Sequence, residues 1–133
     1  MPALRAQSVK FLLDSSAILA YLLDEPEAAR VVALQRQAGL PFVSLSELYA
    51  ALWLRYGQAK ADHAIASIRQ WHLPWMWPNE QVMLVAGRLR ALHRLGLADS
   101  LIAALAFVSG ATLVTKDSDF RALEPDLKLL FLR

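Results

Sequence analysis

Three acidic residues of this sequence lie just after apolar segments, at positions where a metal ion could be bound. Asp14 ends a short apolar run, Glu47 lies in the first turn of the helix expected after a second run, and Asp117 follows the run 111–115. In open parallel α/β sheets, ligands bind beyond the carboxyl ends of the strands, so these three side chains could converge. Clustered carboxylates disfavour joint ionisation, and a divalent cation removes that conflict. The pattern indicates a Mg²⁺ or Mn²⁺ site that could activate water for phosphodiester hydrolysis.

Some of these acids also have a purely structural explanation. Ser44 and Glu47 fit a capping box, in which the glutamate reaches back to the backbone N–H of Ser44. Asp117 and Asp119 could form Asx-turn hydrogen bonds in the loop after their strand. Asp14 is harder to explain in this way, because it stands between an apolar run and a helix at the edge of the expected core. The residues alone leave both interpretations open for Glu47 and Asp117.

Asp99 is a fourth acid of interest, and the sequence pattern alone does not select it. It precedes a helix expected over residues 100–109, where aspartate is a favoured N-cap residue. It follows a helix rather than a strand, so the strand-end argument does not apply to it.

Apolar runs alternate with helical patterns along the chain. Strands are expected at residues 9–13, 41–44, 73–77, 111–115 and 127–132. Helices are expected at residues 15–23, 26–38, 45–56, 59–71, 80–95 and 100–109. Parallel strands need crossover connections, and helices can supply them here. The sequence therefore predicts an α/β fold with a parallel sheet covered on both faces.

Cap residues and glycines mark the expected helix ends. Ser15 or Ser16 is the expected N-cap of the first helix, and Asn79 is that of the fifth. Gly39 and Gly96 are expected just past the ends of the second and fifth helices.

Composition and charge narrow the class of protein. The chain has 133 residues, of which 56% are hydrophobic and 20% charged, so we expect one folded domain over residues 1–133. Cysteine is absent, which excludes disulfides and thiolate metal sites. The net charge of +2 is compatible with nucleic acid binding but does not demonstrate it. The first eight residues lack the apolar segment of a secretory signal, and no run reaches the roughly 20 apolar residues that a membrane span needs, so we expect a cytoplasmic protein.

Several aromatic and basic residues have both a packing and a binding interpretation. For the tryptophans, core or interface packing is favoured over stacking on nucleic-acid bases; they are Trp53, Trp71, Trp75 and Trp77. The apolar stripe of the helix 80–95 is expected to include Leu92, with His93 packed on the same side. Lys116, beside Asp117, is the preferred candidate for contact with a substrate phosphate.

Four segments of the chain, in order, resemble those of PIN-domain proteins. They are LLDSSAIL at residues 12–19, SLSEL at 44–48, LADSLIAALA at 97–106 and TKDSDF at 115–120. Successive acids are 33, 52 and 18 residues apart, and the resemblance covers about residues 9–131. Four segments in the right order are far more specific than any one of them.

The resemblance implies a fold and an activity. The implied fold is a three-layer α/β/α sandwich with a mainly parallel central sheet. The implied activity is Mg²⁺- or Mn²⁺-dependent endoribonuclease cleavage, the hydrolysis of RNA phosphodiester bonds. By the family pattern, the catalytic residues that ligate the metal directly or through water are Asp14, Glu47, Asp99 and Asp117.

The family pattern also implies supporting residues. Ser16 would order the surroundings of Asp14, and Thr115 would orient Asp117 or a ligated water. Members differ in which acid of the last segment reaches the metal, so Asp119 is expected to support the ligating acids and not to bind the metal directly.

In size and style the chain looks most like the VapC toxins of bacterial and archaeal toxin–antitoxin pairs. Such proteins usually form homodimers. They are inhibited by an antitoxin protein whose tail covers the acidic groove, often with an arginine that points at the carboxylates. The resemblance therefore implies a second copy and a small antitoxin as partners, besides the RNA substrate.

Three other kinds of protein have some of these sequence features. A PIN nuclease that acts in RNA processing without an antitoxin has the same sequence features. A PIN-like module that only binds proteins would not need the complete set of acids. A receiver-type signalling domain is disfavoured, because it needs a phosphoacceptor aspartate after its third strand and residues 73–78 contain none.

Overall fold

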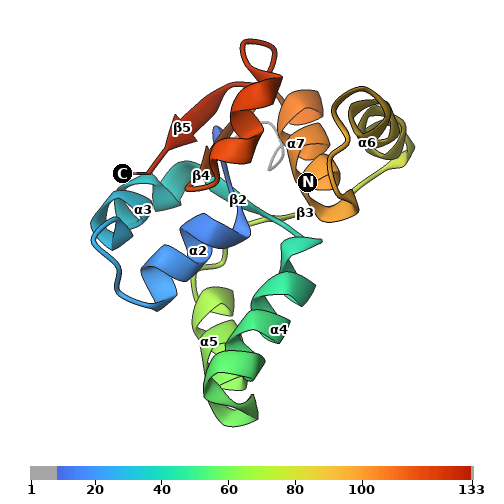
Figure 1. The fold of residues 1–133 in the computed structure, drawn as a ribbon. Helices are drawn as coiled ribbons and strands as arrows, with labels where there is room; N and C mark the ends of the chain where they lie inside the picture. The colour runs from blue at the N-terminus through green and yellow to red at the C-terminus, as the bar shows by residue number, and fades with distance from the viewer. Residues whose placement is uncertain (1–8, 133) are drawn as a thin grey trace.

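Five short parallel strands form one sheet in the order β3-β2-β1-β4-β5 (Figure 1). The structure is a computed structural model that describes residues 9–132. The strands are β1 (Phe11–Leu13), β2 (Ala38–Pro41), β3 (Trp75–Met76), β4 (Thr112–Thr115) and β5 (Leu129–Phe131). In the central strand β1, Leu12 is in register with Gly39 of β2 and with Leu113 of β4. The predicted parallel sheet is confirmed.

Helices connect successive strands and cover both faces of this sheet (Figure 1). They are α2 (Ser15–Leu22), α3 (Ala28–Leu34), α4 (Ser44–Tyr56), α5 (Gln58–Arg69), α6 (Glu80–His93) and α7 (Leu97–Ser109), with the short 3₁₀ helices η1 (Gln35–Gln37) and η2 (Ser118–Leu123). The predicted three-layer α/β/α sandwich is therefore confirmed.

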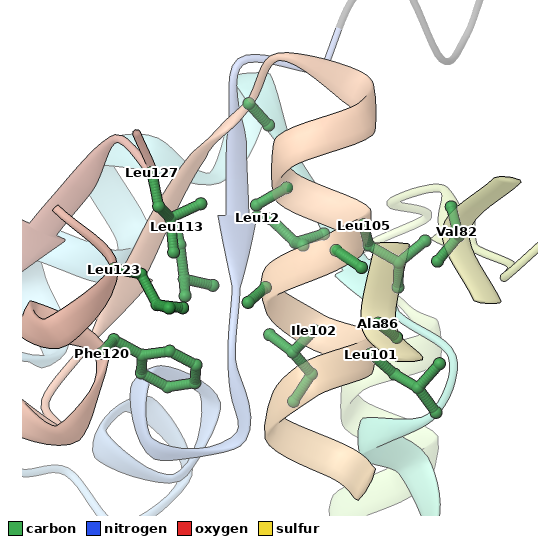
Figure 2. Close-up of a cluster of buried hydrophobic side chains, with 14 of the residues drawn as sticks. Leu12, Val82, Ala86, Leu101, Ile102, Leu105, Leu113, Phe120, Leu123 and Leu127 are labelled. Atoms are coloured by element: carbon green, nitrogen blue, oxygen red, sulfur yellow. The ribbon is translucent and has the colours of Figure 1, made fainter. Parts of the chain in front are cut away.

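Alternating side chains of the central strands feed two separate apolar cores. Leu12 and Leu113 point to the face covered by α6 and α7, where they meet Ile102 and Phe120 (Figure 2). The next residues, Leu13 and Val114, belong to the second core, which α2, α3, α4 and α5 cover. Successive side chains of a strand point to opposite faces, so each strand is buried on both sides.

The boundary between the second helix and the second strand differs from the expected one. Helix α3 ends at Leu34, and β2 already begins at Ala38 instead of residue 41. Gly39 therefore lies inside the strand and does not end a helix. A Cβ atom at Gly39 would be 3.2 Å from side-chain atoms of both Val9 and Met76, so close packing of the strand explains this glycine.

The junction between α6 and α7 also differs. Arg94, with φ of 57°, adopts the left-handed conformation that ends α6, whereas Gly96 is the N-cap of α7. Helix α7 thus begins at Leu97 and not at residue 100. Asp99 lies in its first turn and is not its cap, so the N-cap interpretation of this acid is wrong.

The last turn of α6 is more exposed than expected. The residues of α6 that are fully buried are Val82 and Ala86, both in its first half. Leu92 is 65% exposed and His93 is exposed as well, so the prediction that they pack is wrong. Among residues 9–132, no helix has the length and apolar character needed to cross a bilayer.

Candidate active site

Parallel strands bring four of the predicted acids to one edge of the sheet. Asp14 directly follows β1, Asp117 lies two residues beyond β4, and Glu47 is in the first turn of α4, shortly after β2. Because these strands are parallel, their carboxyl ends lie at the same edge. Helix α7 leads into β4 and so begins at that edge, which brings Asp99 there too. This explains how an acid that follows a helix can join acids that follow strands.

Asp14 is held rigidly at the end of the central strand. Its side chain is only 3% exposed and accepts hydrogen bonds from Ser16 Oγ at 2.6 Å, from the backbone N–H of Ala17 at 2.9 Å and from Thr115 Oγ1. The bond to Ala17 makes Asp14 itself the N-cap of α2, where Ser15 or Ser16 was expected. Asp14 therefore caps α2, and the three hydrogen bonds fix the orientation of its carboxylate.

Two buried or half-buried hydroxyls join β1 to β4 around this carboxylate. Thr115 Oγ1 is fully buried and accepts the backbone N–H of Asp117 at 2.9 Å, while it donates to Asp14. Ser16 Oγ accepts the backbone N–H of Lys116 at 2.8 Å. Ser16 and Thr115 thus contact Asp14 and set the backbone that carries Asp117.

The last two acids form a turn of their own. The backbone N–H of Asp119 donates to Asp117 Oδ1 at 2.9 Å, and this bond begins η2. The Asx turn considered from the sequence is therefore present. Asp119 is exposed, whereas Asp117 is partly buried nearer the strand end.

The acids lie close enough to change the pKa of one another. Burial raises the pKa of Asp14, and the charge of Asp117 raises it further, although the hydrogen bonds from Ser16 and Thr115 oppose this shift. Partial burial and the charges of Asp99 and Asp14 raise the pKa of Glu47. The first, second and fourth segments of the chain therefore meet in a common electrostatic field.

Asp99 belongs to the same field. Partial burial raises its pKa, and the charges of Asp117 and Asp119 raise it further. The carboxylates do not, however, form a closed coordination shell. Across residues 9–132, no three Asp, Glu or His side chains are close enough to hold a metal ion as they stand.

Glu47 does not cap α4, the helix in which it lies. The N-cap of α4 is Val43, with no side-chain capping bond, and Ser44 Oγ is buried without a hydrogen-bond partner in the described part of the chain. The capping box considered from the sequence is thus not formed. Glu47 is exposed, which leaves its carboxylate available to a ligand.

A sequence comparison decides the family. The PIN domain family model matches residues 11–124, a range that contains all four acids. The chain belongs to the PIN domain family. No curated protein matches the sequence.

Solved structures of VapBC proteins share this fold. The chain resembles VapBC2 from Rickettsia felis, bound to a DNA fragment from their promoter, with a TM-score of 0.77 and 18% identity over 94% of this chain and 100% of that one. For VapBC-1 from nontypeable Haemophilus influenzae the TM-score is 0.75, with 22% identity over 93% and 98%. For VapBC-5 from Mycobacterium tuberculosis, a member of the VapBC family of toxin–antitoxin systems, it is 0.68, with 19% identity over 95% and 98%. The resemblance to VapC-like PIN domains is confirmed for the fold.

Lys116 of this PIN domain is engaged with two glutamates that sequence reasoning did not single out. Its ammonium nitrogen lies 2.8 Å from Glu25 Oε1 and 3.3 Å from Glu27 Oε2, both in the segment between α2 and α3. The hydrogen bond from Lys116 to Glu25 is the main reason that the pKa of the lysine is raised. The glutamates lie about 90 residues away in the sequence, so no local spacing signals this pairing.

We expect the metal-free PIN domain to become more stable as the pH falls from neutral through the raised pKa values of its acids. The folded state holds protons on Asp14, Glu47 and Asp99 at a pH where the unfolded chain has lost them, so stability rises until the unfolded pKa values are reached. Urea unfolding in EDTA across this pH range measures the effect. The slope should be smaller in Asp14→Asn, and equal slopes in the two proteins would contradict the assignment.

Proposed function

We propose that this chain is a divalent-metal-dependent endoribonuclease that acts as the toxin of a toxin–antitoxin pair. The observation that carries the proposal is the electrostatic field at the sheet edge. Every charged residue that shifts the pKa of Asp14, Glu47 or Asp99 is itself an acid. Such a site favours a divalent cation, and nucleases of this kind use one to act on the phosphodiester backbone.

The donor set suits Mg²⁺ or Mn²⁺ in its chemistry. All the candidate ligands are carboxylate oxygens, which hard cations of this type prefer. Asp14 is fixed by three hydrogen bonds, whereas Glu47 is exposed and Asp99 is partly exposed on the first turns of their helices. Binding would therefore draw these more exposed acids toward Asp14.

When bound, the metal would act as a Lewis acid and would lower the pKa of a coordinated water. The chain supplies the orientation of the ligands. Ser16 and Thr115 donate to the two oxygens of Asp14, and these hydrogen bonds offset part of the rise in pKa that burial causes in this carboxyl. Thr115 also holds the backbone of Asp117, so one hydroxyl fixes two candidate ligands with respect to each other.

Divalent-ion-dependent RNA cleavage tests the proposal. Purified protein should cut single-stranded or loop RNA within total cellular RNA in the presence of Mg²⁺ or Mn²⁺, stop in EDTA, and resume when the ion is restored. Mapping of the cut ends identifies the target. Cleavage that persists in EDTA, or intact RNA in the presence of both ions, would refute the nuclease assignment.

The toxin role adds two partners. VapBC-5, which shares the fold, is a member of a family of toxin–antitoxin systems, and this supports a small antitoxin as a partner of this chain. We propose in addition that this antitoxin covers the acidic site and that the chain forms a homodimer. Expression of the chain alone should arrest growth, and co-expression of a small gene next to its own should relieve the arrest. Normal growth during active RNA cleavage would favour a PIN nuclease of RNA processing instead.

We expect Lys116→Gln to weaken RNA binding and to reduce the salt dependence of binding. If the ammonium exchanges Glu25 and Glu27 for a phosphate, its removal should lower the slope of log K against log salt by about one. Filter binding at several salt concentrations measures the slope. Lys128→Gln, an exposed lysine at the start of β5, is the control, and an unchanged slope in Lys116→Gln would limit this lysine to its ion pairs.

A further inference from the structure

A pair of stacked aromatic rings, one half-buried and one exposed, lies at the same sheet edge as the acids. Phe42 follows β2 and Trp77 follows β3, and the two rings stack with centroids 3.6 Å apart and planes at 19°. The backbone N–H of Phe42 donates to the carbonyl of Met76 at 2.9 Å, which fixes the two strand ends side by side. Trp75 packs edge-on against Phe42 at 6.0 Å. Trp77 nevertheless remains 63% exposed, so it does not pack in the core of the single chain, and of the two kinds of packing expected only packing at an interface is left open.

A cavity extends from Phe42, one ring of this pair, to the candidate ligand Glu47. It has a volume of about 870 Å³, within the usual range for small-ligand sites. Phe42 lines one part of it and Glu47 another, while Leu97 and Ala98 line it from the first turn of α7, beside Asp99. Arg69 of α5 adds a cationic side chain to the wall. The cavity thus contains an aromatic ring, a cation and a candidate metal ligand.

We propose that Trp77, supported by Phe42, is a stacking platform for an unpaired RNA base next to the phosphodiester that is cut. The proposal rests on the proposed nuclease function and adds a subsite to it. An aromatic side chain stacks on any base with about 1–3 kcal/mol, and a base inside a duplex is not free to do so. Arg69 would then meet a phosphate of the same strand. The site therefore selects single-stranded RNA with little preference for sequence.

The charges in the cavity favour RNA over a second copy of this chain as the occupant. An apolar protein surface placed over Phe42 and this cavity would desolvate Glu47, Asp62 and Arg69 without pairing them, which is costly. A nucleotide offers a flat base to the aromatic ring, a phosphate to the guanidinium and, through the metal, a ligand for the acidic end.

Binding of a short single-stranded RNA of mixed sequence tests the platform. The assay uses the full chain with Asp14→Asn and Mg²⁺, so that the RNA stays intact. Adding Trp77→Ala should raise the Kd by about 10-fold, which corresponds to roughly 1.4 kcal/mol of stacking. Trp77→Phe should bind nearly as well as the parent. Trp53→Ala is the control, since Trp53 is also exposed but lies on α4 against Tyr49, and not beside Phe42 at the ends of β2 and β3.

Tryptophan emission supplies a second measurement. Single-stranded RNA should quench the emission of the parent protein and of Trp53→Phe, but much less that of Trp77→Phe, and a duplex of the same sequence should quench none of them. An unchanged Kd in Trp77→Ala would overturn the proposal. It would also be overturned if sedimentation showed that Trp77→Ala turns a dimer into monomers with no loss of RNA affinity, because a second copy would then cover the ring.

The platform and the nuclease can fail separately. If the single variant Trp77→Ala cleaves RNA with the same KM as the wild type, the platform proposal is refuted and the nuclease proposal stands. Protein that binds RNA through Trp77 but never cleaves it would support the platform and remove the nuclease.

Discussion

Asp14→Asn should abolish RNA cleavage and leave the fold intact. An amide is nearly isosteric with a carboxylate but is a poor ligand for a hard cation, so the expected loss is about a thousand-fold or more, equivalent to roughly 4 kcal/mol of transition-state stabilisation. The amide oxygen can still accept the hydrogen bonds from Ser16 and Ala17, and the hydroxyl of Thr115 can rotate to meet the amide nitrogen. Cleavage rates in Mg²⁺, with circular dichroism as the test of fold, measure both parts.

Asp14→Asn should also affect the stability of the metal-free protein. Burial raises the pKa of Asp14, which means that its charge is unfavourable in the metal-free fold. The metal-free Asp14→Asn protein should therefore be at least as stable as wild type at neutral pH. Asp126→Asn is the matched control for activity, because Asp126 is exposed and is not one of the four candidate metal ligands. Rates in Asp14→Asn within a few-fold of wild type would exclude Asp14 as a metal ligand.

Asp99→Asn should cause a loss of similar size. Asp99 lies in the first turn of α7, and the charges of Asp117 and Asp119 raise the pKa of its carboxyl, so it lies near the acids that follow β4. It has no capping role, because Gly96 precedes the helix as N-cap and no side-chain bond is made there. The substitution therefore removes a candidate ligand without removing a structural contact. Single-turnover cleavage of the same RNA measures the effect.

The amount of Mn²⁺ needed for activity sharpens the test of Asp99. A ligand that is lost should raise the half-saturating Mn²⁺ concentration, whereas a residue that only shapes the cavity should not. Asp126→Asn again serves as the control. If Asp99→Asn kept wild-type rates at wild-type metal concentrations, the third ligand of the proposed site would have been assigned wrongly.

Sequence reasoning succeeded where a single local signal decides the outcome. Asp14 ends an apolar run and lies at the carboxyl end of β1, as predicted, because a buried strand that reaches the sheet edge places its next residue there. Asn79 caps α6 as expected, with its side chain 2.9 Å from the backbone N–H of Val82. Parallel topology followed from the alternation of strands and helices.

The errors arose where tertiary contacts override local signals. Gly39 has the position of a helix terminator, yet close packing against Val9 and Met76 requires a residue without a side chain inside β2. Arg94 adopts the left-handed conformation that Gly96 was expected to supply. Likewise, only the three-dimensional fold brings Glu25 to Lys116, across 91 residues of sequence.

The hydroxyl of Thr115 reaches Asp14 across 101 residues, from one central strand to its neighbour. During synthesis, Asp14 therefore leaves the ribosome long before Thr115 and the rest of β4, which orient its carboxylate. Chains that stop short of β4 contain Asp14, Glu47 and Asp99 but lack both Thr115 and Asp117. Under the proposed nuclease function, an unfinished polypeptide would therefore lack part of the site, and the ability to cut RNA would arise only after β4 and Asp117 have been synthesised.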